Sequence, residues 1–138
     1  MSHPIRAALL DTDILSAVMR QHPGALAQTR AYLAVHQHLT FSSMTRYAIL
    51  RGLAAKKATA QVTAFDLLCS VSRILPLTDA IIVRAATIYG DLHQRGALIG
   101  DADILIAATG IEHGLVVVTN NEHHFNRIAA IQLENWLV

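Results

Sequence analysis

The sequence contains only one cysteine, Cys69, among its 138 residues. A lone cysteine excludes a disulfide framework, and its position in the apolar run 65–69 indicates a small core residue. No stretch approaches the roughly 18 consecutive apolar residues of a membrane-spanning helix, and the N-terminus lacks the long apolar segment of a secretion signal. We therefore expect a soluble, unexported protein that works in the reducing cytoplasm.

The sequence also lacks a strong charge of either sign. The sequence has eleven Lys and Arg residues and ten Asp and Glu residues, which gives a formal net charge of +1. This value does not by itself indicate a nucleic-acid-binding protein, because affinity for phosphates depends on clustered cations. Arg46, Arg51, Lys56 and Lys57 are such a candidate cluster along one predicted helix, although a solvated helix face explains them equally well.

The length and the order of apolar segments predict an α/β fold. We expect residues 1–138 to form one domain with one core. The aliphatic runs 7–10, 39–42 and 115–118 predict buried strands, and the weaker runs 74–75 and 131–133 predict an additional strand and an edge strand. Helical patterns lie around 26–34, 49–54, 78–95 and 101–114. Because parallel strands need crossover helices, this alternation predicts a three-layer α/β/α sandwich with a mainly parallel sheet.

Acidic residues follow the first strand and begin a later helix. Asp11 and Asp13 come directly after the run 7–10, and Asp101 and Asp103 come directly after Gly100. Capping of a helix N-terminus explains one acid of each pair. Two acids two positions apart on a helix point about 200° apart, so they need not share a ligand. Of the second pair, we expect Asp103 to reach the cleft beyond the strands and Asp101 to support it.

Two asparagines follow the third strong strand at the same predicted edge of the sheet. Asn120 and Asn121 come after the run 115–118, where a simple turn is the alternative explanation. If these acids and amides converge, their oxygens suit Mg²⁺ or Mn²⁺ better than Zn²⁺. A divalent cation would offset the repulsion among the carboxylates, activate water and stabilise charge on a phosphate.

Three segments together resemble the PIN-domain toxins of the VapC family. They are 10–15 (LDTDIL), 99–108 (IGDADILIAA) and 118–125 (VTNNEHHF), and the resemblance extends through 131–136. It implies a PIN-domain fold and a Mg²⁺- or Mn²⁺-dependent endoribonuclease that attacks structured RNA such as tRNA. It also implies neutralisation by a cognate VapB antitoxin and a homodimer.

The resemblance also assigns expected roles to individual residues. Asp11 matches the first motif acid, Asp103 the acid before the Ile-Ala-Ala helix, and Asn121 a position where many members carry Asp or Asn. The expected catalytic positions are Asp11, Ala48, Asp103 and Asn121, the expected metal ligands are Asp11, Asp103 and Asp101, and the expected RNA contacts are Arg46 and Arg51. Asp101 is an additional acid whose direct role the resemblance does not define.

The sequence departs from the family pattern at position 48. The family carries Glu in a motif like TRYEILRG, whereas residues 45–52 read TRYAILRG. The methyl group of Ala48 can neither bind a metal nor accept a proton, so we expect weak metal binding and little or no cleavage. A Glu→Ala change made to express a toxic protein explains this best, because every other motif is intact. A genomic Ala at this position would contradict that interpretation.

Two other classes of protein remain as alternatives. A catalytically silent PIN-fold module that binds RNA or an antitoxin is favoured if Ala48 is natural. A phospho-accepting receiver domain also gathers acids at the ends of parallel strands. That class places a Lys after its last strand, and no Lys follows Lys57 here.

Overall fold

The computed structural model of the chain describes residues 4–138. Twelve elements follow one another in this part of the chain. They are β1 (Ala8–Leu10), α1 (Thr12–Met19), α2 (Pro23–His36), β2 (Thr40–Ser42), α3 (Ser43–Ala55), α4 (Thr59–Ser70), β3 (Arg73–Leu75), α5 (Asp79–Gln94), α6 (Asp101–Glu112), β4 (Val116–Val118), α7 (Glu122–Phe125) and β5 (Leu133–Glu134). Among residues 4–138, no helix is long and apolar enough to cross a membrane.

The strands pair in parallel, as the sequence predicted. Strand β4 pairs with β1 on one side and with β5 on the other, and β2 pairs with β3. These pairings form two sheets, β1-β4-β5 and β2-β3, and β2 lies beside β1, so that the five strands stand side by side in the order β3-β2-β1-β4-β5. The predicted additional strand is therefore β3, and the predicted edge strand β5 does lie at an edge.

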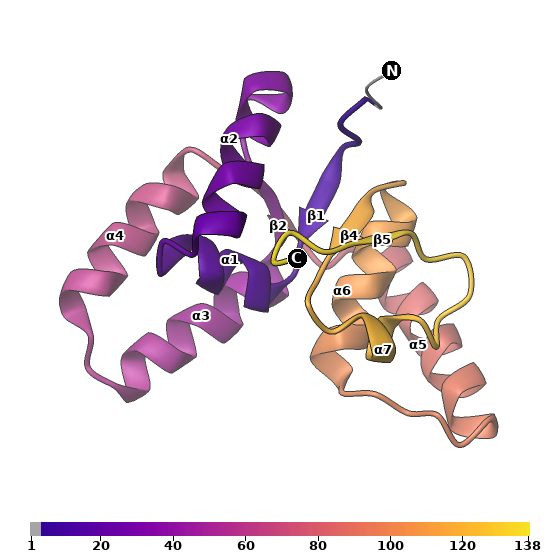
Figure 1. Cartoon of the computed structure of the whole chain (residues 1–138). Coiled ribbons are helices and arrows are strands. Elements are labelled where there is room, and N and C mark those ends of the chain that lie inside the picture. Colours follow the sequence, from indigo (N-terminus) through magenta and orange to yellow (C-terminus); the bar gives the residue numbers. More distant parts are fainter. Residues whose placement is uncertain (1–3) are drawn as a thin grey trace.

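The side chains of β1 and β4 alternate between two apolar clusters, which lie on opposite faces of the sheet. Leu10 and Val118 pack in the cluster that contains Phe41, Phe65 and Trp136. The side chains of Leu9 and Val117 pack in the other cluster, with residues of α5 and α6. Helices α1 to α4 therefore cover one face and α5 and α6 the other (Figure 1). This arrangement confirms the three-layer sandwich.

Polar residues at the strand ends also begin the helices. The side chain of Asp11 caps α1 and accepts a hydrogen bond from the backbone of Thr12, and the side chain of Ser42 caps α3. The chain therefore turns from β1 into α1, and from β2 into α3, at the carboxyl edge of the strands. This edge is where ligands bind in open parallel sheets.

Helix α4 is the longest element that the sequence patterns missed, and the short helix α7 was not predicted either. Only Phe65 of this helix is fully buried, and Leu67 is 67% exposed. Apolar residues recur at helical spacing when one face of a helix is buried. A helix that buries only one side chain therefore shows a weak periodic pattern in its sequence. Cys69, expected in the core, lies half-buried near the end of this helix.

Candidate active site

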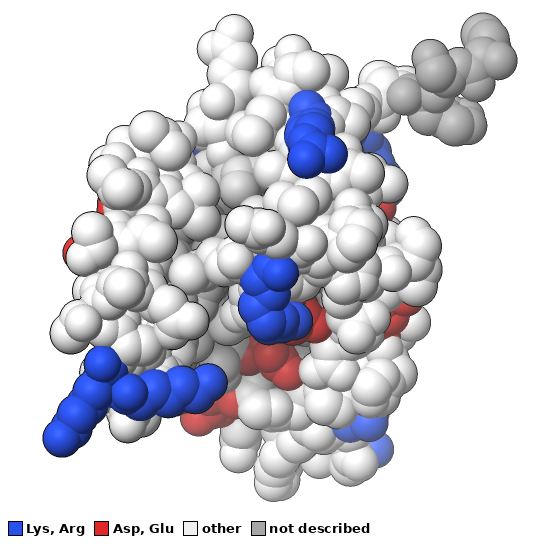
Figure 2. Space-filling view, turned by 60° about the vertical axis from the view of Figure 1, so that its left-hand side comes forward, with Lys and Arg blue, Asp and Glu red and all other residues white. Residues whose placement is uncertain are grey.

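A polar cavity of about 410 Å³ lies at the carboxyl ends of β1 and β4. We call it the acid cavity. Its walls come from four parts of the chain: the start of α1, the middle of α3, the start of α6 and the turn after β4. The lining residues are Asp11, Thr12, Asp13, Ala48, Arg51, Ala102, Asp103, Ile106, Asn120 and Asn121. Figure 2 shows acidic side chains gathered in a hollow of the surface, with basic side chains at its rim.

Asp11 is the most firmly held acid of this cavity. Its backbone N–H donates to the carbonyl of Val118, which joins it to the neighbouring strand. One carboxylate oxygen accepts from Thr12 N (2.7 Å), and the other accepts from the hydroxyl of Thr119 (2.8 Å). Burial, reinforced by the charge of Asp13, raises the pKa of Asp11 to about 7 despite these hydrogen bonds. The site therefore holds either a proton or a compensating positive charge at neutral pH.

Asp13 also lines the acid cavity, although it was not among the expected catalytic positions or metal ligands. Its Oδ2 accepts a hydrogen bond from Asn120 N at 3.0 Å, whereas its buried Oδ1 has no hydrogen-bond partner. Burial again raises the pKa of this carboxyl. The expectation that capping explains one acid of the pair is confirmed for Asp11, which caps α1 and faces the cavity as well. Sequence spacing offers no sign of such a double role.

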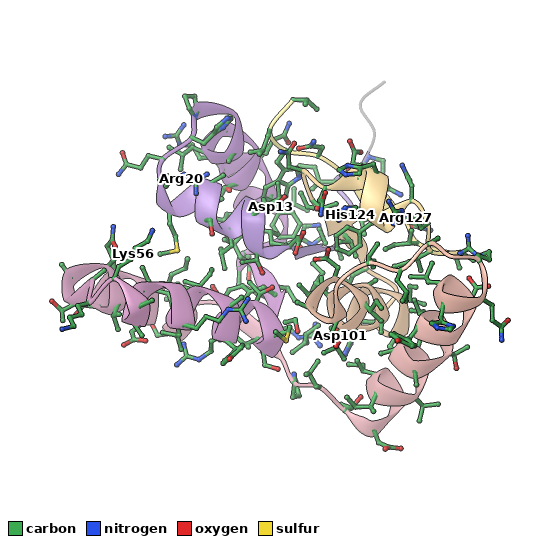
Figure 3. All side chains as sticks on the ribbon, turned by 90° about the horizontal axis from the view of Figure 1, so that it is seen from below. Asp13, Arg20, Lys56, Asp101, His124 and Arg127 are labelled. Carbon is green, nitrogen blue, oxygen red and sulfur yellow. The ribbon has the colours of Figure 1, made fainter. Side chains whose placement is uncertain are left out.

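The second acidic pair separates as its helical spacing predicts. Asp103 lines the acid cavity, with its Oδ2 3.6 Å from Nδ1 of His124. Burial raises the pKa of Asp103, and the nearby imidazole of His124 opposes that rise. Asp101 is exposed at the first position of α6 and does not line the cavity. Figure 3 shows it apart from Asp13 and His124. The structure thus places the expected metal ligand Asp101 outside the site.

Asn121 faces the cavity and is oriented by two neighbours. Its backbone N–H donates to the hydroxyl of Thr119 (2.9 Å), the same hydroxyl that holds Asp11. Its side-chain amide Nδ2 lies 2.6 Å from Nδ1 of His124. This contact directs the amide nitrogen to the imidazole and leaves the carboxamide oxygen available to the cavity. The sequence did not indicate this orienting role of His124 or of Thr119.

Position 48 lies in the wall of the acid cavity, on the side of α3. A longer side chain there would extend from the same wall that carries Arg51, one turn further along the helix. The guanidinium of Arg51 lies over the ring of Tyr47, with its central carbon 5.3 Å from the ring centre. Ala48 contributes only a methyl group to a cavity that three carboxylates face.

Arg46, the other expected RNA contact, does not line the acid cavity. Its guanidinium donates to Sγ of Cys69 (3.0 Å), lies 3.8 Å from the carboxylate of Asp66 and covers the ring of Phe65. These contacts direct it to α4. The two arginines were predicted together because both flank the altered motif, but they face different neighbours.

The acid cavity fits a divalent cation through its donor chemistry. Three carboxyl groups with raised pKa values face one space, and Oδ1 of Asp13 is a buried acceptor without a donor. Carboxylate and amide oxygens are the preferred ligands of Mg²⁺ and Mn²⁺. Within residues 4–138, no three His, Cys, Asp or Glu side chains already stand together as ligands of one ion. On the α3 side, Ala48 adds no oxygen to this set.

Known proteins are similar to this chain in sequence and in fold. The PIN domain family model matches residues 8–131. Ribonuclease VapC2 of Rickettsia felis is 29% identical over 93% of this chain and 96% of its own length. The tRNA(fMet)-specific endonuclease VapC of Salmonella typhimurium is 32% identical over 65% of this chain and 66% of its own.

A solved structure shows the same fold over nearly the full chain. It is that of VapBC2 from Rickettsia felis bound to a DNA fragment from the promoter, at a TM-score of 0.84 and 27% identity, covering 94% of this chain and 98% of that one. The matched region includes every residue that lines the acid cavity. The chain belongs to the PIN domain family and is of the VapC type.

Proposed function

We propose that this chain is a VapC-type ribonuclease toxin whose complete site hydrolyses RNA phosphodiesters with the help of Mg²⁺ or Mn²⁺. The observation that carries the proposal is the acid cavity, where Asp11, Asp13 and Asp103 face one space at the carboxyl edge of the sheet. Carboxyl groups whose pKa burial raises gain most from a cation, because the cation offsets the cost of ionising them. The relatives named ribonuclease support the same class of reaction.

Asp11, Asp13 and Asp103 would hold the cation, with the carboxamide oxygen of Asn121 as a further donor. The bound ion would supply positive charge that activates water and stabilises the phosphate in the transition state. The chain's own residues position these groups. The hydroxyl of Thr119 fixes Asp11 and the backbone of Asn121, and Arg51 at the cavity wall is placed to bind a phosphate oxygen.

Position 48 decides whether the site is complete. We propose that a carboxylate at this position completes the cation site and that the chain with Ala48 is an inactivated Glu→Ala variant. The support is geometric, because Ala48 lies in the wall that faces the three acids. The second candidate is a catalytically silent PIN module that binds RNA or an antitoxin. It is favoured if Ala48 is the natural residue, because the methyl group of Ala48 cannot bind a cation.

Named relatives and surface features support the proposed partners. The Rickettsia felis neighbour is a VapBC complex, so we propose a VapB-type antitoxin for this chain. The Salmonella relative is named for its action on tRNA(fMet), so tRNA is the proposed substrate and the cytoplasm the proposed compartment. Exposed apolar side chains on α5, among them Ile82, Val83 and Tyr89, support a homodimer.

Cleavage of RNA by matched variants tests the proposed function. Total tRNA and a defined RNA panel would be incubated with this chain, with Ala48→Glu, and with Ala48→Glu combined with Asp103→Asn, in Mg²⁺ and in Mn²⁺. We expect cleavage by Ala48→Glu alone, because only that variant has the full set of carboxylates. If folded Ala48→Glu cleaves no RNA, the proposal of a ribonuclease is overturned and the catalytically silent binding module is favoured.

A further inference from the structure

A second cavity, of about 530 Å³, lies between α1, α3 and α4. We call it the side groove. Thr12 and Ala48 line both this groove and the acid cavity, so the two spaces meet at these residues. A chain that lies in the groove can therefore continue past position 48 to the three carboxylates. Pockets of this volume hold molecules as large as a nucleotide.

With Ala48, the side groove carries positive charge without a balancing acid; the Glu proposed for position 48 would add one acid only at the end where the groove meets the acid cavity. Arg20 and Lys56 line it, and no Asp or Glu does. Among residues 4–138, neither cation takes part in an ion pair. Figure 3 shows both on the same side of the molecule, one from each side of the groove. Each follows the last turn of a helix, where cations are favoured, but that preference does not explain why both line one groove.

The wall of the side groove between these cations is apolar. Met19, Leu53 and Leu68 line it from three different helices, and Gln61 adds one polar side chain. A single-stranded nucleic acid presents an anionic phosphate and a flat base face at every nucleotide, and proteins bind such strands with cations and with side chains, mostly aromatic, against which the bases pack. The groove supplies two cations and an aliphatic wall in place of aromatic rings.

We propose that the side groove binds the RNA strand adjacent to the scissile phosphate, with Arg20 and Lys56 on backbone phosphates and a base against the wall formed by Met19, Leu53 and Leu68. This inference rests on the proposed function and names where its substrate lies. RNA is favoured over a peptide because the groove opens into the acid cavity, where a phosphate must lie for cleavage. An acidic or apolar segment of a protein partner is the alternative occupant.

Binding of a labelled RNA to charge variants tests this assignment. The probe is a fluorescein-labelled single-stranded RNA of about twelve nucleotides, the length range that such grooves cover. Its dissociation constant would be measured across salt concentrations by anisotropy for this chain and for Arg20→Gln with Lys56→Gln. The control, Arg30→Gln with Arg73→Gln, removes the same charge at exposed positions that line neither cavity.

The double variant is expected to bind the RNA at least about tenfold more weakly at low salt. The slope of log affinity against log salt should fall by about 1.4, since each contact to a single-strand phosphate contributes about 0.7. The control should retain the slope of the unchanged chain. Melting temperatures within error of the parent protein would show that all variants fold.

The outcomes separate this inference from the proposed function. If Ala48→Glu cleaves RNA and its Arg20→Gln, Lys56→Gln derivative binds and cleaves like the control, the inference is overturned and the ribonuclease stands. Equal RNA binding combined with lost affinity for a purified antitoxin would assign the groove to the protein partner and overturn it too. If the unchanged chain does not bind the probe, the inference also fails, whatever the cleavage result.

Discussion

At the scale of single residues, the acid cavity depends on one hydroxyl group. Thr119 is fully buried, and its hydroxyl donates to Asp11 while accepting from the backbone of Asn121. The same atom therefore fixes a candidate cation ligand from β1 and the turn after β4. A side chain that keeps the shape and loses the hydroxyl would leave both partners without their hydrogen bonds.

Thr119→Val is expected to lower the free energy of unfolding by about 1–3 kcal/mol, because a buried carboxyl and a backbone N–H lose their partner. Urea denaturation at neutral pH measures this change. Thr87→Val serves as a control, since the hydroxyl of Thr87 bonds only a carbonyl of its own exposed helix. If both variants lose equally little stability, Thr119 does not organise the cavity as described.

At the scale of elements, the position of Asp103 depends on how closely α6 approaches β4. Gly110 of α6 allows this approach, since a Cβ atom there would lie 2.6 Å from Cγ2 of Val117. A contact this short requires the buried side chain of Val117, or the helix against the strand, to shift. The first turn of the same helix carries Asp103, so a shift would also disturb the acid cavity.

Gly110→Ala is expected to destabilise the protein by about 1–3 kcal/mol through overpacking. Gly90→Ala is the matched control, because a Cβ at this position of α5 meets no atom within 4 Å. That control should stabilise the protein by up to about 1 kcal/mol through helix propensity. Thermal unfolding of both variants measures the difference, and an unchanged melting temperature for Gly110→Ala would contradict the close packing.

The sequence predicted elements and site residues to different degrees, for physical reasons. Buried parallel strands are continuous apolar runs, so all five strand positions were predicted, and α5 was bounded by Thr78 and Gly96. Helix α4 was missed because apolar residues also occur on its exposed face, so no helical spacing of apolar residues stands out in its sequence. Helix geometry predicted that Asp101 and Asp103 diverge, and the resemblance assigned Asp103 to the site, whereas Asp13 and His124 depend on tertiary contacts that no local spacing reports.

At the scale of the whole molecule, the acid cavity makes stability depend on pH. Asp11 has a pKa of about 7 in the folded state and an ordinary value of 3.8. Between these values the folded state holds a proton that the unfolded state has released, so stability falls as pH rises. One proton corresponds to a slope of at most about 1.4 kcal/mol per pH unit.

Asp11→Asn is expected to reduce this slope between about pH 4 and pH 7, while Asp13 and Asp103, whose pKa values are also raised, retain their part of it. The free energies of unfolding of the variant and the unchanged chain would be measured by urea denaturation across this range without divalent cations. Asp101→Asn, at an exposed position outside the cavity, should retain the slope. An equal slope in Asp11→Asn would show that burial does not raise the pKa of Asp11.

The central claim is that the acid cavity is a divalent-cation site that a carboxylate at position 48 completes. Titration with Mn²⁺, followed by electron paramagnetic resonance, tests it most directly on this chain, on Ala48→Glu and on Asp13→Asn. We expect Ala48→Glu to bind Mn²⁺ at least about tenfold more tightly and Asp13→Asn to bind more weakly than this chain, since each changes one facing carboxylate. Equal affinities for all three folded proteins would contradict the claim.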